Sequence, residues 1–151
     1  MRMNIVGTVE SLLAEKGAQV WTVEPDALVF EAIQILAEHN VGALPVVRGG
    51  ALIGMFSERD YTRKVMLRGK SSRQIRVREI ISPHIITVEP GDPIADCMRL
   101  MTEHRIRHLP VLSGGRLAGL ISIGDVVNWI ISAQSCALQQ MEEYVVGQYP
   151  G

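Results

Sequence analysis

The chain contains the same unit twice, and this duplication limits its fold more than any other feature. A shift of 65 residues aligns residues 22–65 with residues 87–130 without a gap, and 15 of the 44 aligned positions are identical. A repeat of this length is one supersecondary unit that buries its apolar face against its neighbour. We therefore expect two similar units packed together. The identical stretches of the first unit are Thr22–Pro25, Glu38–His39, Leu44–Val46, Gly49–Gly50, Leu52, Gly54, Ser57 and Asp60.

Each unit shows the same order of local patterns. Apolar residues at i, i+3, i+4 and i+7 predict an amphipathic helix in each repeat, and Asp92-Pro93 has the form of a capping residue before a first-turn proline. Two apolar runs joined by Gly-Gly predict a β-hairpin, and a second helix begins at Ser57 or Ser122. We expect an α/β (α+β) fold of two β-α-β-β-α repeats packed as a pseudo-two-fold pair. The helix stripes are Val29, Ala32, Ile33, Leu36 and Ile94, Cys97, Met98, Met101.

The chain divides into five parts on these patterns. We place an N-terminal segment at 1–16, the first repeat at 17–68, a linker at 69–81, the second repeat at 82–131 and a C-terminal helical tail at 132–151. Neither repeat alone is long enough to bury a core easily. The tail has more apolar residues than one surface helix needs, so we expect it to pack across a partner.

Composition and charge exclude several classes of function. The formal net charge is −1, which argues against a protein that binds nucleic acid or an anionic membrane mainly by electrostatic attraction. The apolar stretches fall short of the roughly 18–20 residues that cross a bilayer, and the N-terminus does not read as a secretory signal. Cys97 and Cys136 have no CxxC spacing, so we expect reduced cysteines in a cytoplasmic protein.

One local stretch departs from this balanced charge. Seven Lys and Arg residues lie between positions 63 and 78 with no acidic residue among them. We interpret the stretch as a solvated helix end and linker. Contact with a bound polyphosphate, with a partner protein or with nucleic acid stays open. The residues are Arg63, Lys64, Arg68, Lys70, Arg73, Arg76 and Arg78.

The doubled motif carries a family resemblance. Each repeat has an apolar run with Leu-Pro-Val, a Gly-Gly turn and a Gly-apolar-apolar-Ser-x-x-Asp sequence, which occurs as Gly54–Asp60 and Gly119–Asp125. Over roughly residues 17–131 this pattern resembles the cystathionine β-synthase (CBS) domain family, in its small single-pair form. The resemblance implies two clefts for adenine-containing ligands such as AMP, ADP, ATP, NAD(H) or S-adenosylmethionine. It also implies a regulatory role and a homodimer.

The two Ser-x-x-Asp pairs have two interpretations. Serine at a helix N-cap with an acidic residue three positions later forms a capping box, which needs no ligand. Alternatively, the helix start attracts phosphate and the carboxylate accepts both hydroxyls of a ribose. The family resemblance favours the second interpretation, in which Asp60 and Asp125 hold ribose while Ser57 and Ser122 lie near phosphate or ribose.

The resemblance further implies that each cleft draws on both repeats. The first cleft would contain Ser57, Arg59, Asp60, Ile85, Ile86, Arg107 and His108. The second would contain Val20, Trp21, Gly42, Ala43, Ser122, Gly124 and Asp125. Arg107 is a permanent cation and His108 a titratable one, whereas their equivalents in the second cleft bring only backbone. We therefore expect phosphate to bind more tightly in the first cleft.

No pattern in the sequence assembles a catalyst or a metal site. Ser57 has no histidine base in its motif, and the two aspartates belong to separate repeats. The four histidines are scattered, and Gly69-Lys70-Ser71 lacks the earlier glycine of a phosphate loop. We expect a nucleotide sensor that signals to a partner through repeat packing. The alternatives are a ligand-free interaction scaffold and a module that binds S-adenosylmethionine.

Overall fold

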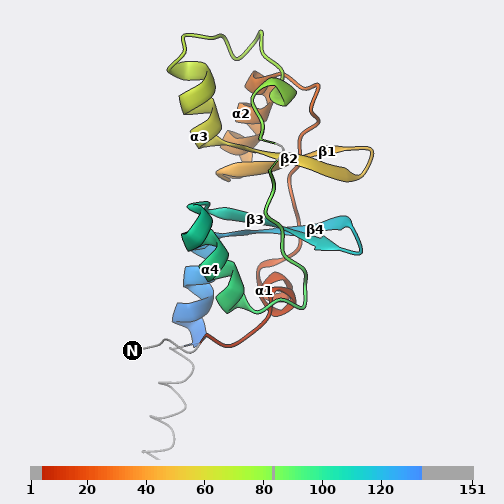
Figure 1. The fold of residues 1–151 in the computed structure, drawn as a ribbon, viewed down its shortest axis with the longest axis vertical. Helices are drawn as coiled ribbons and strands as arrows, with labels where there is room; N and C mark the ends of the chain where they lie inside the picture. The colour runs from red at the N-terminus through yellow and green to blue at the C-terminus, as the bar shows by residue number, and fades with distance from the viewer. Residues whose placement is uncertain (1–4, 83, 134–151) are drawn as a thin grey trace, which may run out of the picture.

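The fold consists of two similar halves that lie one above the other (Figure 1). The computed structural model describes residues 5–82 and 84–133. The first half contains α2 (Val29–His39), β1 (Ala43–Arg48), β2 (Ala51–Ser57) and α3 (Glu58–Tyr61), which continues into a π-helical segment (Thr62–Met66). The second half contains α4 (Ile94–His104), β3 (His108–Ser113), β4 (Arg116–Ser122) and helical residues 123–133. The predicted mixed fold of two paired repeats is confirmed.

The two hairpins face each other at the centre, with the helices toward the outer ends (Figure 1). Each hairpin is an antiparallel pair with one bulge, at Val46/Val47 in the first and at Val111/Leu112 in the second. Both glycines of the first turn have positive φ, 57° at Gly49 and 82° at Gly50. A two-residue turn with positive φ at both residues has a twist that matches the twist of the two strands it joins. β2 and β4 contact each other across the middle of the molecule.

The strand expected before each first helix is only a single bridge. Val23 pairs in parallel with Val46, and Val88 pairs in the same way with Val111. The first helices carry the predicted apolar stripe, with Val29, Ala32 and Leu36 fully buried and the equivalent residues of α4 buried likewise.

The start of α4 differs from the expected cap. Pro93 itself is the N-cap and Ile94 the first helical residue. The Asp92 carboxylate instead accepts a hydrogen bond from the backbone N–H of Glu89 at 2.8 Å, inside the preceding turn.

The two halves exchange their leading segments. Helix α1 (Val9–Lys16) packs in the core of the second half, whereas residues 75–80, with the 3-10 turn Val77–Glu79, pack in the core of the first. The backbone N–H of Val9 donates to Asp92 O at 2.9 Å, and that of Val77 donates to Ala27 O at 2.9 Å. Ala27 and Asp92 are equivalent residues of the two repeats, so the two hydrogen bonds correspond to each other. The duplication therefore includes both leading segments, but these are not separated by the 65 residues that relate the rest of the repeats. Each half therefore completes its core with chain from the other side of the repeat boundary.

Two glycines make room for α1 and for the chain that directly follows residues 75–80. A Cβ on Gly54 of β2 would lie 2.8 Å from Ile81 Cδ1, and a Cβ on Gly119 of β4 would lie 2.8 Å from Leu13 Cδ2. The glycines shared by the two repeats thus serve close packing at these positions. Most of the predicted C-terminal tail, residues 134–151, lies outside the described residues. None of the described helices is long and apolar enough to cross a membrane.

Candidate functional site

Both Ser-x-x-Asp motifs form helix caps. The backbone N–H and the hydroxyl of Ser57 donate to Asp60 Oδ2 at 3.0 and 2.9 Å, and the backbone N–H of Asp60 donates to Ser57 Oγ at 3.1 Å. In the second repeat the backbone N–H of Ser122 donates to Asp125 Oδ2 at 2.8 Å, and that of Asp125 donates to Ser122 Oγ at 3.1 Å. The capping interpretation is therefore realised in both repeats, and ligand binding by the same carboxylates stays a prediction.

A lysine pairs with each of these aspartates. Lys64 Nζ lies 3.2 Å from Asp60 Oδ1, one helical turn along the same helix, and donates to Ile80 O at 2.7 Å. Lys16 Nζ reaches Asp125 Oδ2 at 2.5 Å from α1. The i,i+4 spacing of Asp60 and Lys64 is a recognised sequence signal for an ion pair. No local pattern could have indicated Lys16, which lies 109 residues from its partner.

One cavity of about 370 Å³ receives side chains from both repeats. Arg59, just after the start of α3, and Arg107, just before β3, both line it, so two residues predicted for the first cleft are brought together. The other five residues predicted for this cleft do not line the cavity: Ser57, Asp60, Ile85, Ile86 and His108. The residues that line the cavity are Arg59, Met101, Thr102, Arg105, Ile106, Arg107 and Ile123.

His108 lies between the two predicted clefts. A Cβ on Gly42 would lie 3.3 Å from His108 Cε1, so the starts of β1 and β3 are neighbours. Burial, the largest effect, lowers the pKa of His108; Lys16 and Arg107 lower it further, and Asp125 acts in the opposite direction. His108 belongs to the predicted first cleft and Gly42 to the predicted second, and the His108 side chain lies next to the Gly42 backbone at the boundary of the repeats.

The residues predicted for the second cleft occupy separate surroundings. Trp21 is 37% exposed and stacks on His39, with ring centroids 3.4 Å apart and an angle of 10° between the planes. Val20 is half-buried, Ala43 is buried at the start of β1, and Gly124 is exposed. Asp125 lines a smaller cavity of about 190 Å³. Its other lining residues are Leu12, Glu15, Lys16, Asn128, Trp129 and Ser132, none of which was assigned to this cleft.

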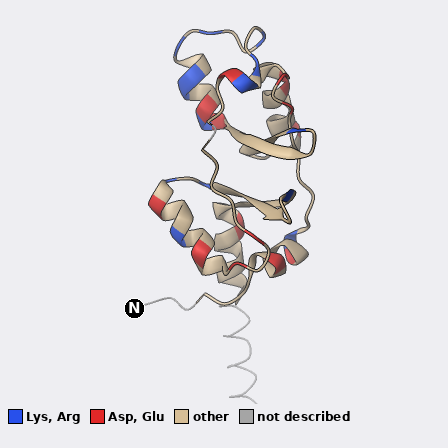
Figure 2. Cartoon of the chain, turned by 45° about the vertical axis from the view of Figure 1, so that its right-hand side comes forward, with Lys and Arg blue, Asp and Glu red and all other residues tan. Residues whose placement is uncertain are grey.

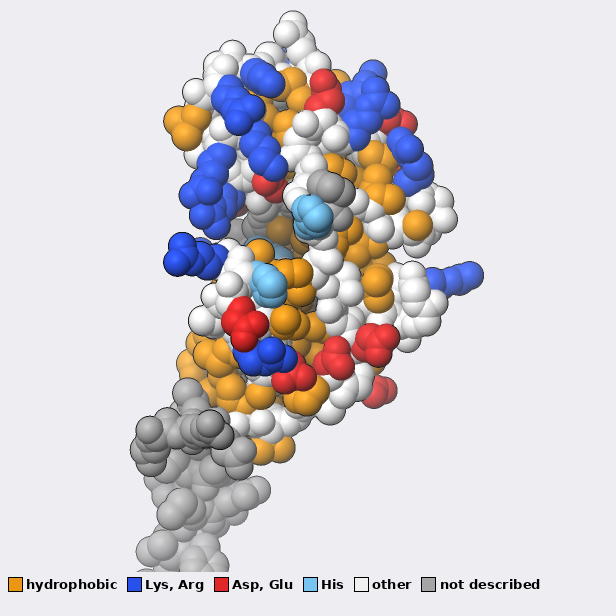
Figure 3. Space-filling view, in the orientation of Figure 1, with side chains coloured by type: hydrophobic (Ala, Val, Ile, Leu, Met, Phe, Trp, Pro, Cys, Tyr) orange, Lys and Arg blue, Asp and Glu red, His pale blue; other side chains and the backbone are white. Residues whose placement is uncertain are grey.

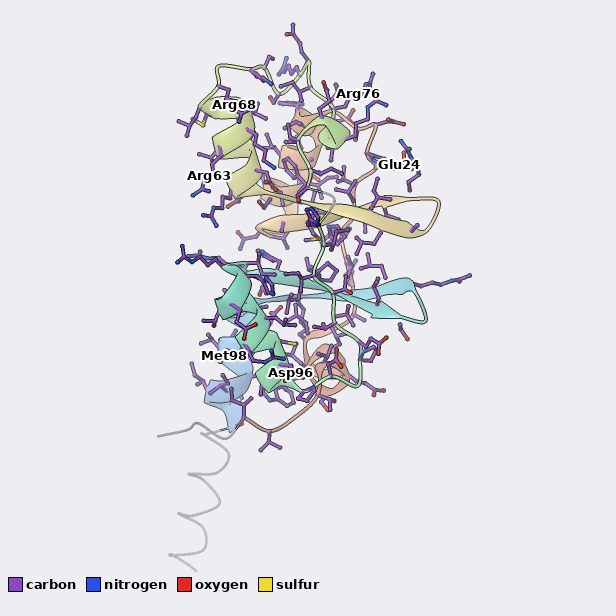
Figure 4. The ribbon with its side chains drawn as sticks, in the orientation of Figure 1. Glu24, Arg63, Arg68, Arg76, Asp96 and Met98 are labelled. Atoms are coloured by element: carbon purple, nitrogen blue, oxygen red, sulfur yellow. The ribbon has the colours of Figure 1, made fainter. Side chains whose placement is uncertain are left out.

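The basic stretch is distributed over the outer end of the first half (Figure 2). Several of its members have structural contacts within the described residues. Arg76 Nη1 donates to Asp26 O at 2.5 Å, Arg78 forms an ion pair with the Asp26 carboxylate at 2.8 Å, and Arg73 lies over the Phe30 ring. Arg63 and Arg68 lie on a different side of this end from Arg76 (Figure 4). A single basic face is therefore not formed.

Thiol and metal chemistry have little support in the described part of the chain. No group of three or more His, Cys, Asp or Glu side chains gathers there as a metal site would require. Cys97 is completely buried in the second core, and burial, aided by Asp92 and Asp96, raises its pKa to about 11. Cys136 lies outside the described residues.

Comparison with known proteins detects the same duplicated unit. The family model described as CBS domain matches residues 16–67 and again residues 77–132. The CBS domain-containing protein CBSX3, mitochondrial, of Arabidopsis thaliana is 39% identical over an alignment of 138 residues, and the match covers 88% of this chain and 66% of that protein. This chain thus spans just under two thirds of that relative. The CBS domain-containing protein YhcV of Bacillus subtilis is 36% identical over 108 residues, or 72% of this chain and 76% of the relative.

Solved structures that resemble this chain also contain CBS domains. A CBS-domain protein from Burkholderia ambifaria is 47% identical, with a TM-score of 0.81 over 85% of this chain and 96% of that one. The CBS domain pair of protein MJ0100, in complex with 5′-methylthioadenosine and S-adenosyl-L-methionine, has a TM-score of 0.72 over 85% of this chain and 98% of that one. It is 21% identical to this chain, and the likeness is one of fold.

Proposed function

Because this chain belongs to the CBS domain family, we propose that it is a regulatory module that binds an adenine nucleotide between its two repeats. The candidate ligands are AMP, ADP, ATP and NAD(H). S-adenosylmethionine is the alternative, since the MJ0100 pair of the same fold was solved with it. In this proposal the bound ligand favours one packing of the repeats, and a partner protein responds to that packing. The proposal assigns no catalysis to the chain.

The observation that carries the proposal is the cavity shared by Arg59 and Arg107. Its volume of about 370 Å³ falls within the roughly 300–1,000 Å³ of small-molecule sites. Guanidinium groups bind phosphate through paired N–H donors. A ligand that engages both arginines would bridge the two repeats. The difference between the ligand's affinities for this packing and for any other packing of the repeats would then set how far binding shifts the equilibrium between them.

The aspartates can take ribose only by changing partners. Asp60 and Asp125 each hold a lysine in this structure, and their side chains are 24% and 22% exposed. Ion pairs this close to solvent contribute about 0–1 kcal/mol. A hydrogen bond to a charged group contributes roughly 1.5–3 kcal/mol, and a ribose diol supplies two. The ion pair with lysine is therefore a weak obstacle to ribose binding in either repeat.

Isothermal titration with AMP, ATP, NADH and S-adenosylmethionine tests the proposal. Asp60→Asn and Asp125→Asn should each remove one binding event while the melting temperature changes little, because asparagine keeps an acceptor for the serine N–H. Asp96→Asn, on the exposed face of α4, is the matched control and should bind as the wild type does. If none of the four ligands gives heat, the nucleotide-binding proposal is wrong.

A second candidate is a ligand-free interaction scaffold. The observation in its favour is that both capping boxes are complete without ligand, so the Ser and Asp residues already have a structural role. This candidate predicts that Asp60→Ala lowers the free energy of unfolding by about 0.5–1 kcal/mol through the lost cap. Binding of a partner protein would then be independent of every nucleotide in the titration.

We also propose that the module acts as a homodimer. Met66 and Ile131 occupy equivalent positions in the two repeats and are 62% and 54% exposed, with the exposed apolar residues Leu67 and Val127 near them in sequence. A two-fold partner would cover equivalent patches on both repeats. Light scattering should give the dimer mass for the wild type and the monomer mass for Met66→Lys/Ile131→Lys. Ala14→Lys, at an exposed position of α1, is the control, and an unchanged mass for the double variant would reject this interface.

A further inference from the structure

Three arginines line the cavity between the repeats. Arg105, at the C-terminal end of α4, joins Arg59 and Arg107, and all three side chains are exposed. No carboxylate is among the lining residues, and none of the three arginines forms an ion pair within the described part of the chain. Figure 3 shows Lys and Arg side chains at the left edge of the molecule, both above and below the line where the two halves meet. The cavity therefore concentrates positive charge without an internal counter-charge.

The repeat-equivalent positions lack all three charges. The residues equivalent to Arg59, Arg105 and Arg107 are Gly124, Asn40 and Gly42. Asn40 and Arg105 share a left-handed backbone, with φ of 52° and 53°. Asparagine adopts this region more readily than arginine, so the backbone does not require arginine at position 105. The helix dipole favours a cation at position 105, but no ion pair among the described residues accounts for the grouping of all three arginines around one cavity, and an anionic ligand would.

The charge and geometry favour a ligand with more than one phosphate. Neighbouring guanidinium groups repel one another unless an anion lies between them. Each can bind two oxygens in a bidentate pair, whereas a phosphate monoester offers three terminal oxygens and about −1.5 to −2 charges. Three guanidinium groups thus carry more positive charge than one phosphate monoester can balance. A di- or triphosphate supplies both the extra oxygens and the extra charge.

We propose that this cavity selects nucleoside di- and triphosphates over monophosphates, and that Arg105 is the residue that determines this preference. The inference rests on the proposed nucleotide function and specifies its ligand class. Arg59 is adjacent to Asp60, and Arg107 is adjacent to His108. These two arginines are therefore next to the residues predicted for ribose and the first phosphate, and Arg105 remains for the further phosphates.

Titration of wild type and Arg105→Asn with AMP, ADP, ATP and inorganic tripolyphosphate tests the inference, at constant ionic strength without divalent cations. Asparagine is the residue of the other repeat and keeps the left-handed backbone. The wild type should bind ADP or ATP at least about tenfold more tightly than AMP. Arg105→Asn should lose about tenfold for ADP and ATP, as expected for one lost charged hydrogen-bonding group, and less than about twofold for AMP. Arg116→Asn, on the β3–β4 hairpin, removes the same charge away from the cavity and should change neither.

The outcomes separate this inference from the proposed function. If the wild type binds AMP as tightly as ATP, or Arg105→Asn weakens all three nucleotides equally, the polyphosphate preference is wrong and nucleotide binding stands. If no adenine nucleotide binds, the proposed function fails. Tripolyphosphate then decides: binding that Arg105→Asn weakens supports a polyphosphate site, and absence of binding overturns it.

Discussion

Lys16 Nζ lies 2.5 Å from Asp125 Oδ2 and donates to Leu120 O at 2.7 Å, although the two ion-pair partners are 109 residues apart. The pair joins the exchanged helix α1 to the helix start of the second repeat. Both residues also act on His108, whose pKa Asp125 raises and Lys16 lowers. The N-terminal segment is therefore part of the electrostatic surroundings of one proposed nucleotide-binding carboxylate.

The first prediction concerns the pKa of His108. Lys16→Met removes a nearby cation and should raise this pKa, whereas Asp125→Asn removes the anion and should lower it further. An NMR titration of the imidazole resonances measures both shifts. Lys64→Met, whose lysine pairs with Asp60, should leave the resonance unchanged. Shifts of the same sign in the Lys16 and Asp125 variants would contradict the arrangement.

The same pKa gives stability a pH dependence. Burial lowers the pKa of folded His108 below the ordinary 6.5, so below about pH 6.5 the unfolded chain binds the proton more readily than the folded chain does. The stabilisation is present above about pH 6.5 and decreases as the pH falls toward the folded pKa. Urea unfolding at pH 7.5 and 5.5 should show a smaller loss for His108→Gln than for the wild type. Equal losses in the two proteins would show that His108 does not contribute.

A second prediction tests how α1 docks on the second repeat. A Cβ at position 119 would approach two methyl carbons of Leu13 at 2.8 and 2.9 Å, so Gly119→Ala should cost about 1–3 kcal/mol in unfolding free energy. Leu13→Ala should cost about 2–5 kcal/mol. The double variant should lose less than the sum, because the new methyl group fills space that the leucine vacates. Gly91→Ala, which meets nothing within 4 Å, is the control.

Local sequence patterns predict the repeats, their hairpins and their amphipathic helices, because each depends on neighbouring residues. They also predict the Ser57–Asp60 cap, whose partners are three positions apart. The exchange of α1 with residues 75–80 depends on contacts between distant segments and on a spacing that a gapless alignment does not detect. The pairing of Lys16 with Asp125 follows from that exchange. The placement of Arg105 beside Arg59 depends on how the two repeats pack, which neither repeat encodes alone.

A third prediction concerns the reactivity of Cys97. Burial raises its pKa to about 11, so at pH 8 only about 0.1% of the thiol is ionised, and its side chain is inaccessible. In a Cys136→Ser protein, which leaves Cys97 as the only thiol, reaction with a thiol reagent should require unfolding and should accelerate with urea. A saturating nucleotide should slow it further by stabilising the folded state. Rapid modification in native buffer would contradict the burial of Cys97.

The last prediction uses the stacked pair of Trp21 and His39. In a Trp129→Phe protein Trp21 is the only tryptophan, and its emission reports on the stack, because an imidazole in contact quenches an indole. His39→Ala should therefore raise the emission.

If adenine enters the predicted second cleft, it should displace or cover this stack and change the emission on nucleotide addition. Because Asp125 is the proposed ribose ligand of the same cleft, Asp125→Asn should abolish this change, whereas Asp60→Asn should preserve it. A signal that Asp60→Asn abolishes instead would assign Trp21 to the other cleft and show that the crosswise grouping is wrong.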